Sequence, residues 1–197
     1  MKVTYSDLKN KRVFISGGGS GIGATIVEYF CEQKSEVYFI DIDLKSSNKL
    51  IKKIKKKGFK VPKFIECNIL DVKKLQNIIK DIISKKGAIH CLINSAANDD
   101  RHTTEQVDEK YWENRMGINL KHYFFAAQAV VKGMKKIKSG SIVNLSSVSW
   151  MLGEGDKVVY ETAKSAVVGL TRSFAQEFGK YNIRTNSVIQ GSVATER

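Results

Sequence analysis

The sequence predicts an α/β fold in which one doubly wound parallel sheet carries helices on both faces. Three observations predict it. Short apolar runs rich in β-branched residues alternate with longer amphipathic segments, as in successive βα units. A glycine-rich run follows the first apolar run, where a strand would turn into a helix. No repeat or linker divides the 197 residues, so residues 1–197 form one expected domain.

The apolar runs define six expected strands. They cover residues 12–16, 36–41, 61–66, 91–94, 141–145 and 184–189. Near-continuous apolar stretches such as Val13-Phe14-Ile15 are typical of strands that are buried on both faces of a sheet. The single proline, Pro62, stands at the beginning of the third run, where a missing N–H is tolerated.

Helical segments are expected between these strands. They cover residues 22–33, 45–57, 72–86, 108–136 and 159–179. In the second of them, Ile51 and Ile54 recur at helical spacing between lysines, which indicates a helix with one solvated, charged face. Because parallel strands need crossover connections of one hand, these helices are expected on both faces of the sheet.

The composition excludes several classes of protein. With 42% hydrophobic and 27% charged residues, the chain is neither disordered nor collagen-like. The net charge of +13 raises the question of a nucleic-acid or membrane partner, but the lysines are scattered, so neither partner is expected. No apolar run approaches the roughly 20 residues of a membrane span, and residues 1–10 lack the apolar core of a signal peptide. A cytoplasmic protein is expected.

The cysteines and histidines suggest neither disulfides nor a metal site. The three cysteines are far apart and form no Cys-x-x-Cys pair, so free thiols are expected. The three histidines show no ligand spacing, and no metal is required.

The first motif that carries chemistry is the run 16–23, Ser-Gly-Gly-Gly-Ser-Gly-Ile-Gly. Between a strand and a helix, such glycines let the backbone approach a pyrophosphate, which the helix N-terminus attracts. The next expected strand ends in Asp41, whose carboxylate suits the two adenosine ribose hydroxyls and would repel the 2′-phosphate of NADP. NAD is therefore the expected cofactor. The expected contacts from these two segments are Gly17, Ser20, Gly21, Ile22, Gly23 and Asp41.

The second motif is Tyr160-Glu161-Thr162-Ala163-Lys164, in which the tyrosine and the lysine share one helix face. Ser147 follows the fifth expected strand, and Asn119 lies on the long preceding helix. Oxidation of an alcohol needs a base beside the hydride acceptor, and a free tyrosine with a pKa of about 10 is a poor one. Lys164 and a cationic nicotinamide would both favour the phenolate. Tyr160 is the predicted base, with Ser147 holding the substrate oxygen.

These motifs, in this order, resemble those of the short-chain dehydrogenase/reductase family over nearly the whole chain. The residues 94–97, Asn-Ser-Ala-Ala, stand where the family usually has Asn-Asn-Ala-Gly. The resemblance implies a Rossmann-like, dinucleotide-binding domain. It also implies that Lys164 binds the nicotinamide ribose, that Asn119 holds a water that passes protons from Lys164, that Asp71 meets the adenine, that Asn94 meets the adenosine side and that Thr195 binds the nicotinamide carboxamide.

Two departures from the family concern the end of the chain. Gln190 stands where the family normally has proline, which removes a rigid turn from the loop after the sixth strand. The family also continues into lid helices and a last strand, so we expect this chain to be truncated at its C-terminus, without those elements.

The polar segment Asn98-Asp99-Asp100-Arg101-His102 follows the fourth expected strand, at the edge where ligands bind in open α/β sheets. Fixed polar groups there suit a sugar, and the run resembles the family's bacterial aldose 1-dehydrogenases, those of D-xylose most closely. The same residues could instead only order the loop. The predicted substrate contacts are Asn98, Ser147, Trp150, Asp156, Tyr160 and Gln190.

Three functions therefore remain open at this point. The first is an NAD-dependent sugar 1-dehydrogenase, whose substrate is a small molecule. The second is a 3-oxoacyl-carrier-protein reductase or general carbonyl reductase, and Asp41 argues against it because such reductases usually use NADPH. The third is a non-catalytic NAD-binding protein, against which the intact set of Ser147, Tyr160 and Lys164 argues.

Apolar residues on more than one face of two helices suggest a partner subunit. The helices that carry Asn119 and Tyr160 have this property, and relatives pair such helices, so a homodimer or homotetramer is expected. The alternative is a tightly packed monomer.

Overall fold

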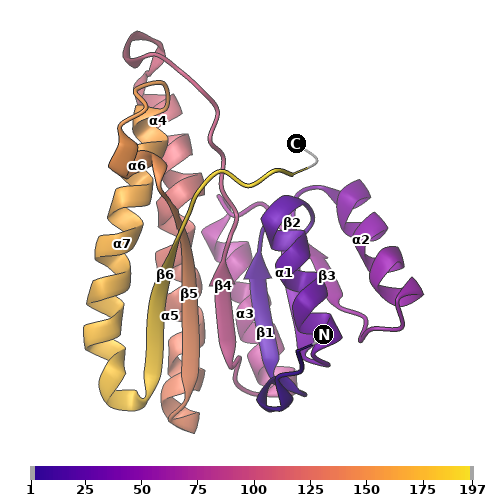
Figure 1. The fold of residues 1–197 in the computed structure, drawn as a ribbon. Coiled ribbons are helices and arrows are strands. Elements are labelled where there is room, and N and C mark those ends of the chain that lie inside the picture. Colours follow the sequence, from indigo (N-terminus) through magenta and orange to yellow (C-terminus); the bar gives the residue numbers. More distant parts are fainter. Residues whose placement is uncertain (1–2, 196–197) are drawn as a thin grey trace.

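The computed structural model describes residues 3–195 and contains one six-stranded sheet (Figure 1). All five strand pairs are parallel, and the order across the sheet is β3-β2-β1-β4-β5-β6. The predicted doubly wound fold is confirmed. The strands are β1 (Arg12–Ser16), β2 (Glu36–Asp41), β3 (Lys63–Glu66), β4 (Cys91–Asn94), β5 (Gly140–Ser147) and β6 (Ile183–Gln190).

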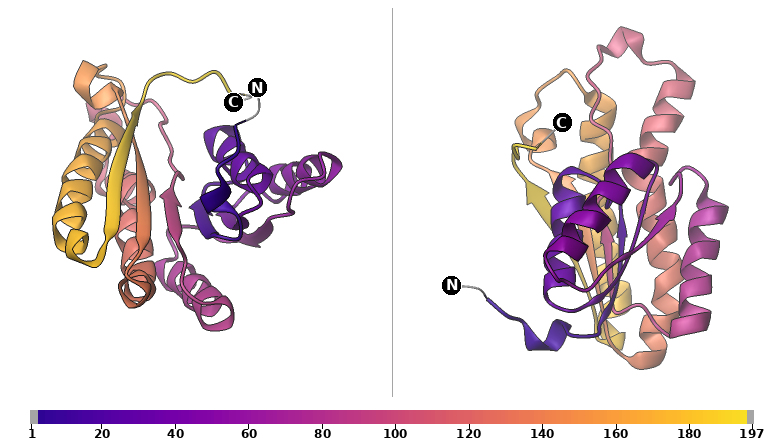
Figure 2. Two further views of the ribbon diagram at one scale, coloured as in Figure 1. Left: turned by 60° about the horizontal axis from the view of Figure 1, so that its bottom comes forward. Right: turned by 90° about the vertical axis from the view of Figure 1, so that its right-hand side faces the viewer.

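The helices form two layers, one on each face of the sheet (Figure 2). The α-helices are α1 (Gly21–Glu32), α2 (Leu44–Lys56), α3 (Val72–Lys86), α4 (Glu109–Met116), α5 (His122–Ile137), α6 (Ser149–Leu152) and α7 (Val158–Phe178). Single turns of 3₁₀ helix lie at η1 (Ser6–Leu8), η2 (Thr104–Gln106) and η4 (Gly179–Tyr181), and a π-helical turn, η3, lies at Gly117–Lys121.

Side-chain alternation along the central strands divides the core between the two faces. On β1, Phe14 packs in a cluster with side chains of α3, α5 and α7, whereas Val13 and Ile15 pack with side chains of α1 and α2. Successive strand residues point to opposite faces, so a strand buried on both sides must be apolar throughout. This explains why the sequence shows continuous apolar runs here rather than alternation.

Three expected elements differ from the structure by more than one residue at an end. The fifth strand, β5, runs from Gly140 to Ser147 rather than over residues 141–145. The expected helix 108–136 is three consecutive pieces, α4, the π-helical turn η3 and α5. The extra residue of a π turn shifts the helical register, which a periodicity averaged over the segment does not reveal. The third strand begins at Lys63 rather than at residue 61, so Pro62 lies just before it. The structure also adds α6, between Ser147 and α7, which the sequence did not predict.

Within residues 3–195, no helix is both long and apolar enough to cross a membrane. The strand ends that matter for a site lie at one edge of the sheet, because all strands are parallel. Residues 191–195 then leave β6 and cross above β4 and β1 toward α1 (Figure 1). A methyl group built on Gly21 would lie 3.6 Å from the methyl carbon of Thr195, so the end of this segment faces the start of α1.

The packing of α1 on the glycine-rich loop predicts that alanine substitutions at two glycines change the free energy of unfolding in opposite directions. A methyl group on Gly23 would lie 1.9 Å from the carbonyl oxygen of Gly17, whereas one on Gly169, in α7, would meet nothing within 4 Å. We expect Gly23→Ala to lower the free energy of unfolding by roughly 1–3 kcal/mol through overpacking. Gly169→Ala should raise it by about 0.4–1 kcal/mol by restricting the unfolded chain. Urea unfolding of both variants measures this, and equal stabilities would contradict it.

Candidate active site

The glycine-rich loop between β1 and α1 is pressed against the segment that follows β4. Gly17 has a φ of +70°, and a Cβ there would lie 2.6 Å from the Cα of Ala96, so both its conformation and its surroundings require glycine. The two loops approach each other where the strand order reverses, between β1 and β4. Crevices at such reversals are where open α/β sheets bind ligands.

The N-terminus of α1 keeps its first N–H groups free of a side-chain cap. Ser20 stands at the N-cap position in extended conformation, but its hydroxyl makes no capping hydrogen bond. The first-turn amides of Gly21, Ile22 and Gly23 therefore form a donor-rich end of the kind that binds phosphate. Thr195 lies beside this end. The loop and the helix start fit the pyrophosphate of a dinucleotide.

The carboxylate of Asp41 is held by backbone at the end of β2. Oδ2 accepts a hydrogen bond from the N–H of Gly19 at 2.8 Å, and Oδ1 accepts from the N–H groups of Ile42 at 2.8 Å and Asp43 at 3.0 Å. These bonds fix the carboxylate beside the glycine-rich loop. A negative charge is thus placed at the carboxyl edge, where the sequence analysis expects the adenosine ribose.

Two other predicted cofactor residues have partners inside the protein. Asp71 is the N-cap of α3, and its Oδ1 accepts from the N–H of Lys74 at 2.8 Å. Asn94 is fully buried, and its Nδ2 donates to Oδ1 of Asn144 at 2.8 Å. The buried Oδ1 of Asn94 accepts no hydrogen bond. The predicted contacts of Asp71 with adenine and of Asn94 with the adenosine side stay predictions. Asn68 follows the end of β3 by two residues, whereas Asp71 directly precedes α3.

The structure brings together Ser147, Tyr160 and Lys164. Ser147 ends β5, whereas Tyr160 and Lys164 lie in the first two turns of α7. The Ser147 hydroxyl lies 2.9 Å from that of Ser149 and close enough to the Tyr160 hydroxyl to affect its ionisation. The Lys164 ammonium lies 5.5 Å from the centre of the Tyr160 ring. Tyr160 is 7% exposed and Lys164 only 1% exposed.

The ionisation of the Tyr160–Lys164 pair is dominated by burial. Burial raises the pKa of Tyr160 above its ordinary value. The neighbouring Ser147 hydroxyl lowers this pKa, and the carboxylates of Asp99 and Glu154 raise it further. Burial lowers the pKa of Lys164 to about 7, against which Asp99 acts. Lys164 gives its hydrogen bonds to other groups while its ammonium lies over the Tyr160 ring, and the expectation that Lys164 and a cationic nicotinamide lower the pKa of Tyr160 stays a prediction.

Tyr123 is a residue that the sequence analysis missed. Lys164 Nζ donates to the Tyr123 hydroxyl at 3.0 Å and to the carbonyl of Leu145 at 2.8 Å, and the Tyr123 hydroxyl donates to the same carbonyl at 3.0 Å. Tyr123 is fully buried. It lies four residues after Asn119, and only the pairing of α5 with β5 and α7 reveals its contact with Lys164.

Asn119 lies in the π-helical turn between α4 and α5 and is fully buried. Its Oδ1 accepts from the N–H of Asn98 and its Nδ2 donates to the carbonyl of Asn98, each at 2.9 Å. The side chain therefore holds the backbone of the segment after β4. π-Helical turns are often found at functional sites, and this one aims an amide at the loop that borders Tyr160.

Comparisons with known proteins identify the family. A family model described as short chain dehydrogenase matches residues 11–197. The protein named "Probable galactose dehydrogenase GalD" of Rhizobium meliloti (strain 1021) is 39% identical over 98% of this chain and 75% of its own length. A D-xylose 1-dehydrogenase of Caulobacter vibrioides is 41% identical over 98% of this chain and 76% of its own length. The chain belongs to the short-chain dehydrogenase family.

A solved structure agrees with this assignment. The aldohexose dehydrogenase (AldT) of Thermoplasma acidophilum, in ligand-free form, superposes with a TM-score of 0.85 and 28% identity, over 98% of this chain and 70% of that one. This short-chain dehydrogenase is accordingly an oxidoreductase that acts on CH–OH groups, and its family uses nicotinamide cofactors.

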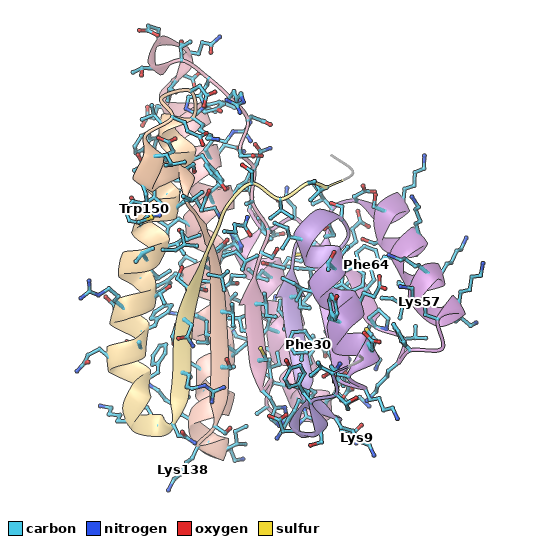
Figure 3. All side chains as sticks on the ribbon, in the orientation of Figure 1. Lys9, Phe30, Lys57, Phe64, Lys138 and Trp150 are labelled. Carbon is cyan, nitrogen blue, oxygen red and sulfur yellow. The ribbon has the colours of Figure 1, made fainter. Side chains whose placement is uncertain are left out.

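The predicted substrate residues of the dehydrogenase lie on different elements of the structure. Gln190 ends β6 directly opposite Ser147, so the two residues are neighbours across the sheet. Asp156 forms an ion pair with Arg101, and Trp150, half-buried in α6 near the upper part of α7, keeps its indole N–H buried (Figure 3). Asn98 is fixed through its backbone by Asn119. Substrate contacts for these four residues stay predictions.

The buried ammonium of Lys164 makes a pH-dependent contribution to stability. Its pKa is about 7 in the folded protein and 10.5 ordinarily, so between these values the unfolded chain binds a proton that the folded protein has released. The free energy of unfolding therefore increases as the pH rises through this window. The destabilisation caused by the buried charge is largest at and below about pH 7.

We expect the free energy of unfolding of the unsubstituted protein, relative to that of Lys164→Met, to rise as the pH increases from about 7 to about 10.5. Urea unfolding at a series of pH values measures the difference, in which other titrating groups cancel. A matched variant, Lys180→Met after the far end of α7, should leave that pH dependence unchanged. If the difference in free energy of unfolding between the unsubstituted protein and Lys164→Met does not change with pH, the Lys164 ammonium is not desolvated.

Proposed function

We propose that the protein is an NAD-dependent sugar 1-dehydrogenase that oxidises the anomeric hydroxyl of an aldose such as D-xylose to the lactone. The observation that carries this proposal is the Ser147–Tyr160 pair at the carboxyl edge, bordered by a charged and polar segment after β4. The carboxylate of Asp99 acts electrostatically on both Tyr160 and Lys164, so the space beside the pair is polar. The resemblance to proteins named as galactose, D-xylose and aldohexose dehydrogenases supports it.

The choice of NAD rests on Asp41. Its carboxylate is fixed by three backbone N–H groups beside the glycine-rich loop. A carboxylate in this position accepts hydrogen bonds from ribose hydroxyls and repels a 2′-phosphate. The residues proposed to hold the dinucleotide are those of the glycine-rich loop, the start of α1, Asp41, Lys164 and Thr195.

In the proposed reaction, Tyr160 takes the proton of the substrate hydroxyl while Ser147 donates a hydrogen bond to the substrate oxygen. When bound, the nicotinamide ring supplies the acceptor for the hydride that leaves the carbon, and its positive charge favours the Tyr160 phenolate. The C–H and O–H bonds of the substrate are replaced by a C=O bond, with the proton on Tyr160. Because burial raises the pKa of Tyr160, sugar oxidation should become faster as the pH rises.

Lys164 and Asn119 have supporting roles in this proposal. Lys164 is anchored by Leu145 and Tyr123 with its ammonium near the Tyr160 ring, where it binds the nicotinamide ribose. Asn119 holds Asn98 and so fixes the wall of the substrate site, and the family's proton path would pass beside it.

We also propose that the dehydrogenase is a cytoplasmic homodimer or homotetramer. Phe124 on α5 is 41% exposed, Trp112 on α4 is 38% exposed and Val158 at the start of α7 is 38% exposed, so these helices leave apolar surface that a second subunit would cover. Cys31, Cys67 and Cys91 are all free thiols, which suits a reducing compartment.

The test is NADH formation by the purified full-length protein with a panel of aldoses and simple secondary alcohols, with NAD and NADP in parallel. We expect oxidation of D-xylose or a similar aldose with NAD. Tyr160→Phe should abolish at least about 99% of it, since general bases contribute about 10²–10⁴-fold. Tyr181→Phe, after the far end of α7, is the matched control. NADPH-dependent reduction of a 3-oxoacyl substrate without aldose oxidation would overturn the proposal.

Cofactor choice predicts different effects for two neighbouring carboxylates. Asp41→Asn should raise the KM for NAD and lower the preference for NAD over NADP, each by roughly tenfold, which corresponds to about 1.4 kcal/mol. Asp43→Asn removes the same charge two residues away, at the exposed N-cap of α2, and keeps a capping oxygen. It should change neither quantity more than about twofold. Equal effects of the two variants would point to general electrostatics rather than to ribose binding.

A further inference from the structure

The segment after β4 is joined by its charged side chains to α4 and to the residues that precede α7. Asp100 accepts from Arg115 of α4 at 2.7 Å, and Arg101 forms an ion pair with Asp156, which precedes α7. These groups are therefore engaged within the protein. The polar character of the segment, which the sequence analysis connected with a substrate, serves in part to attach it to α4 and to the approach of α7.

His102 makes the most extensive of these connections. Its side chain is 6% exposed. Its backbone N–H donates to the carbonyl of Asp156 at 2.7 Å, and its Nε2 accepts from the backbone N–H of Val159 at 3.3 Å. Its Nδ1 lies 2.9 Å from the Tyr111 hydroxyl and 3.1 Å from the carbonyl oxygen of Asp100.

The bond to Val159 satisfies a donor at the N-terminus of α7. The first N–H groups of a helix have no partner inside it and usually bond to a capping side chain. Lys157 occupies the N-cap position of α7 without a side-chain capping bond, and α7 begins at Val158. His102, which is 57 residues away in the sequence, supplies the acceptor instead.

This contact also fixes the ring. Because the Val159 N–H is a donor, Nε2 must carry no proton, and the proton of the neutral ring is on Nδ1. Nδ1–H then has the Asp100 carbonyl and the Tyr111 oxygen as acceptors. The ring is thus held from α4 and from its own segment while it binds α7.

We propose that His102 is a positioning residue that sets the place of Tyr160 relative to the segment after β4. Val159 directly precedes Tyr160, so an acceptor at Val159 fixes the backbone that carries the phenol. The other end of the same segment is fixed by Asn119 through Asn98. The segment is therefore fixed at one end to the π-helical turn η3 and at the other end to the start of α7, the helix that carries Tyr160. This inference rests on the proposed role of Tyr160 as the base.

The test compares His102→Leu, which removes the acceptor, with His102→Gln, which keeps one at the end of the side chain. We expect His102→Leu to lower kcat about 10–100-fold, because misplacement of a reacting group by about 1 Å costs up to about 10²-fold. The KM for NAD should stay within about twofold, since the glycine-rich loop is untouched. His102→Gln should restore kcat to within about fivefold. Arg101→Gln, which breaks only an exposed ion pair of the same segment, is the control and should stay within about threefold.

Hydrogen exchange supplies a readout that needs no substrate. The amides of residues 158–160 should exchange faster in His102→Leu than in the unsubstituted protein or in Arg101→Gln, while those at the far end of α7 should not change. If the unsubstituted protein oxidises no aldose, the proposed function fails and the exchange measurement still decides the role of His102. If His102→Leu does not fold, kcat and exchange of His102→Gln decide.

Three results would overturn the inference. They are a folded His102→Leu protein with kcat within twofold of the unsubstituted protein, unchanged exchange at the start of α7, and a folded His102→Gln protein that is as slow as His102→Leu. If only His102→Gln folds, a loss of more than about tenfold in its kcat or faster exchange at residues 158–160 would have the same meaning.

Discussion

The central position of β1 in a parallel sheet is the constraint on which the rest of the structure depends. With β2 on one side and β4 on the other, the loops that follow β1 and β4 start next to each other and lead to opposite faces. Gly17 and Ala96 meet at this point so closely that a side chain on the first would overlap the backbone of the second. The glycine-rich loop, Asp41, Ser147 and Gln190 all lie at strand ends on this edge, so one topological choice collects them.

The position of α7 depends on hydrogen bonds between its buried polar groups and those of β5. Three consecutive residues of β5 each bond to the helix. Asn144 Nδ2 donates to Thr171 Oγ1 at 3.0 Å, the Leu145 carbonyl accepts from Lys164 Nζ at 2.8 Å, and Ser146 Oγ donates to the Lys164 carbonyl at 2.7 Å. In a low-dielectric interior such bonds are strong and directional, and unpaired groups are costly. The helix that carries Tyr160 is therefore held in one position against the strand that carries Ser147.

The sequence predicted features whose residues lie close together along the chain. It did not predict contacts between residues that lie far apart along the chain. The strands, the turn at Gly17 and the Tyr160–Lys164 spacing are local patterns, and the structure places them as expected. The contacts of His102 with Val159 and of Tyr123 with Lys164 join residues 57 and 41 positions apart, and no local pattern encodes them.

Polar residues at strand ends illustrate the same limit of local patterns. Asp71 and Asn94 have residue types that suit a cofactor, and their predicted cofactor contacts stay predictions. In the structure, Asp71 caps α3, whereas Asn94 bonds through Nδ2 to Asn144 of β5 and leaves its buried Oδ1 without a partner. A carboxylate or amide near the edge is compatible with either use, and only its neighbours in space distinguish them. Asp41 differs because the backbone N–H groups that fix it belong to the glycine-rich loop and to the two residues after β2.

The charges around Tyr160 bear on the class of substrate under the proposed function. Asp99 raises the pKa of both Tyr160 and Lys164, and its own side chain is exposed. Solvent weakens the repulsion between an exposed carboxylate and an anionic carrier. The hydroxyls of a sugar are donors that the same carboxylate accepts. Under the proposed function, Asp99 therefore acts on substrate choice through hydrogen bonds to sugar hydroxyls rather than through charge repulsion.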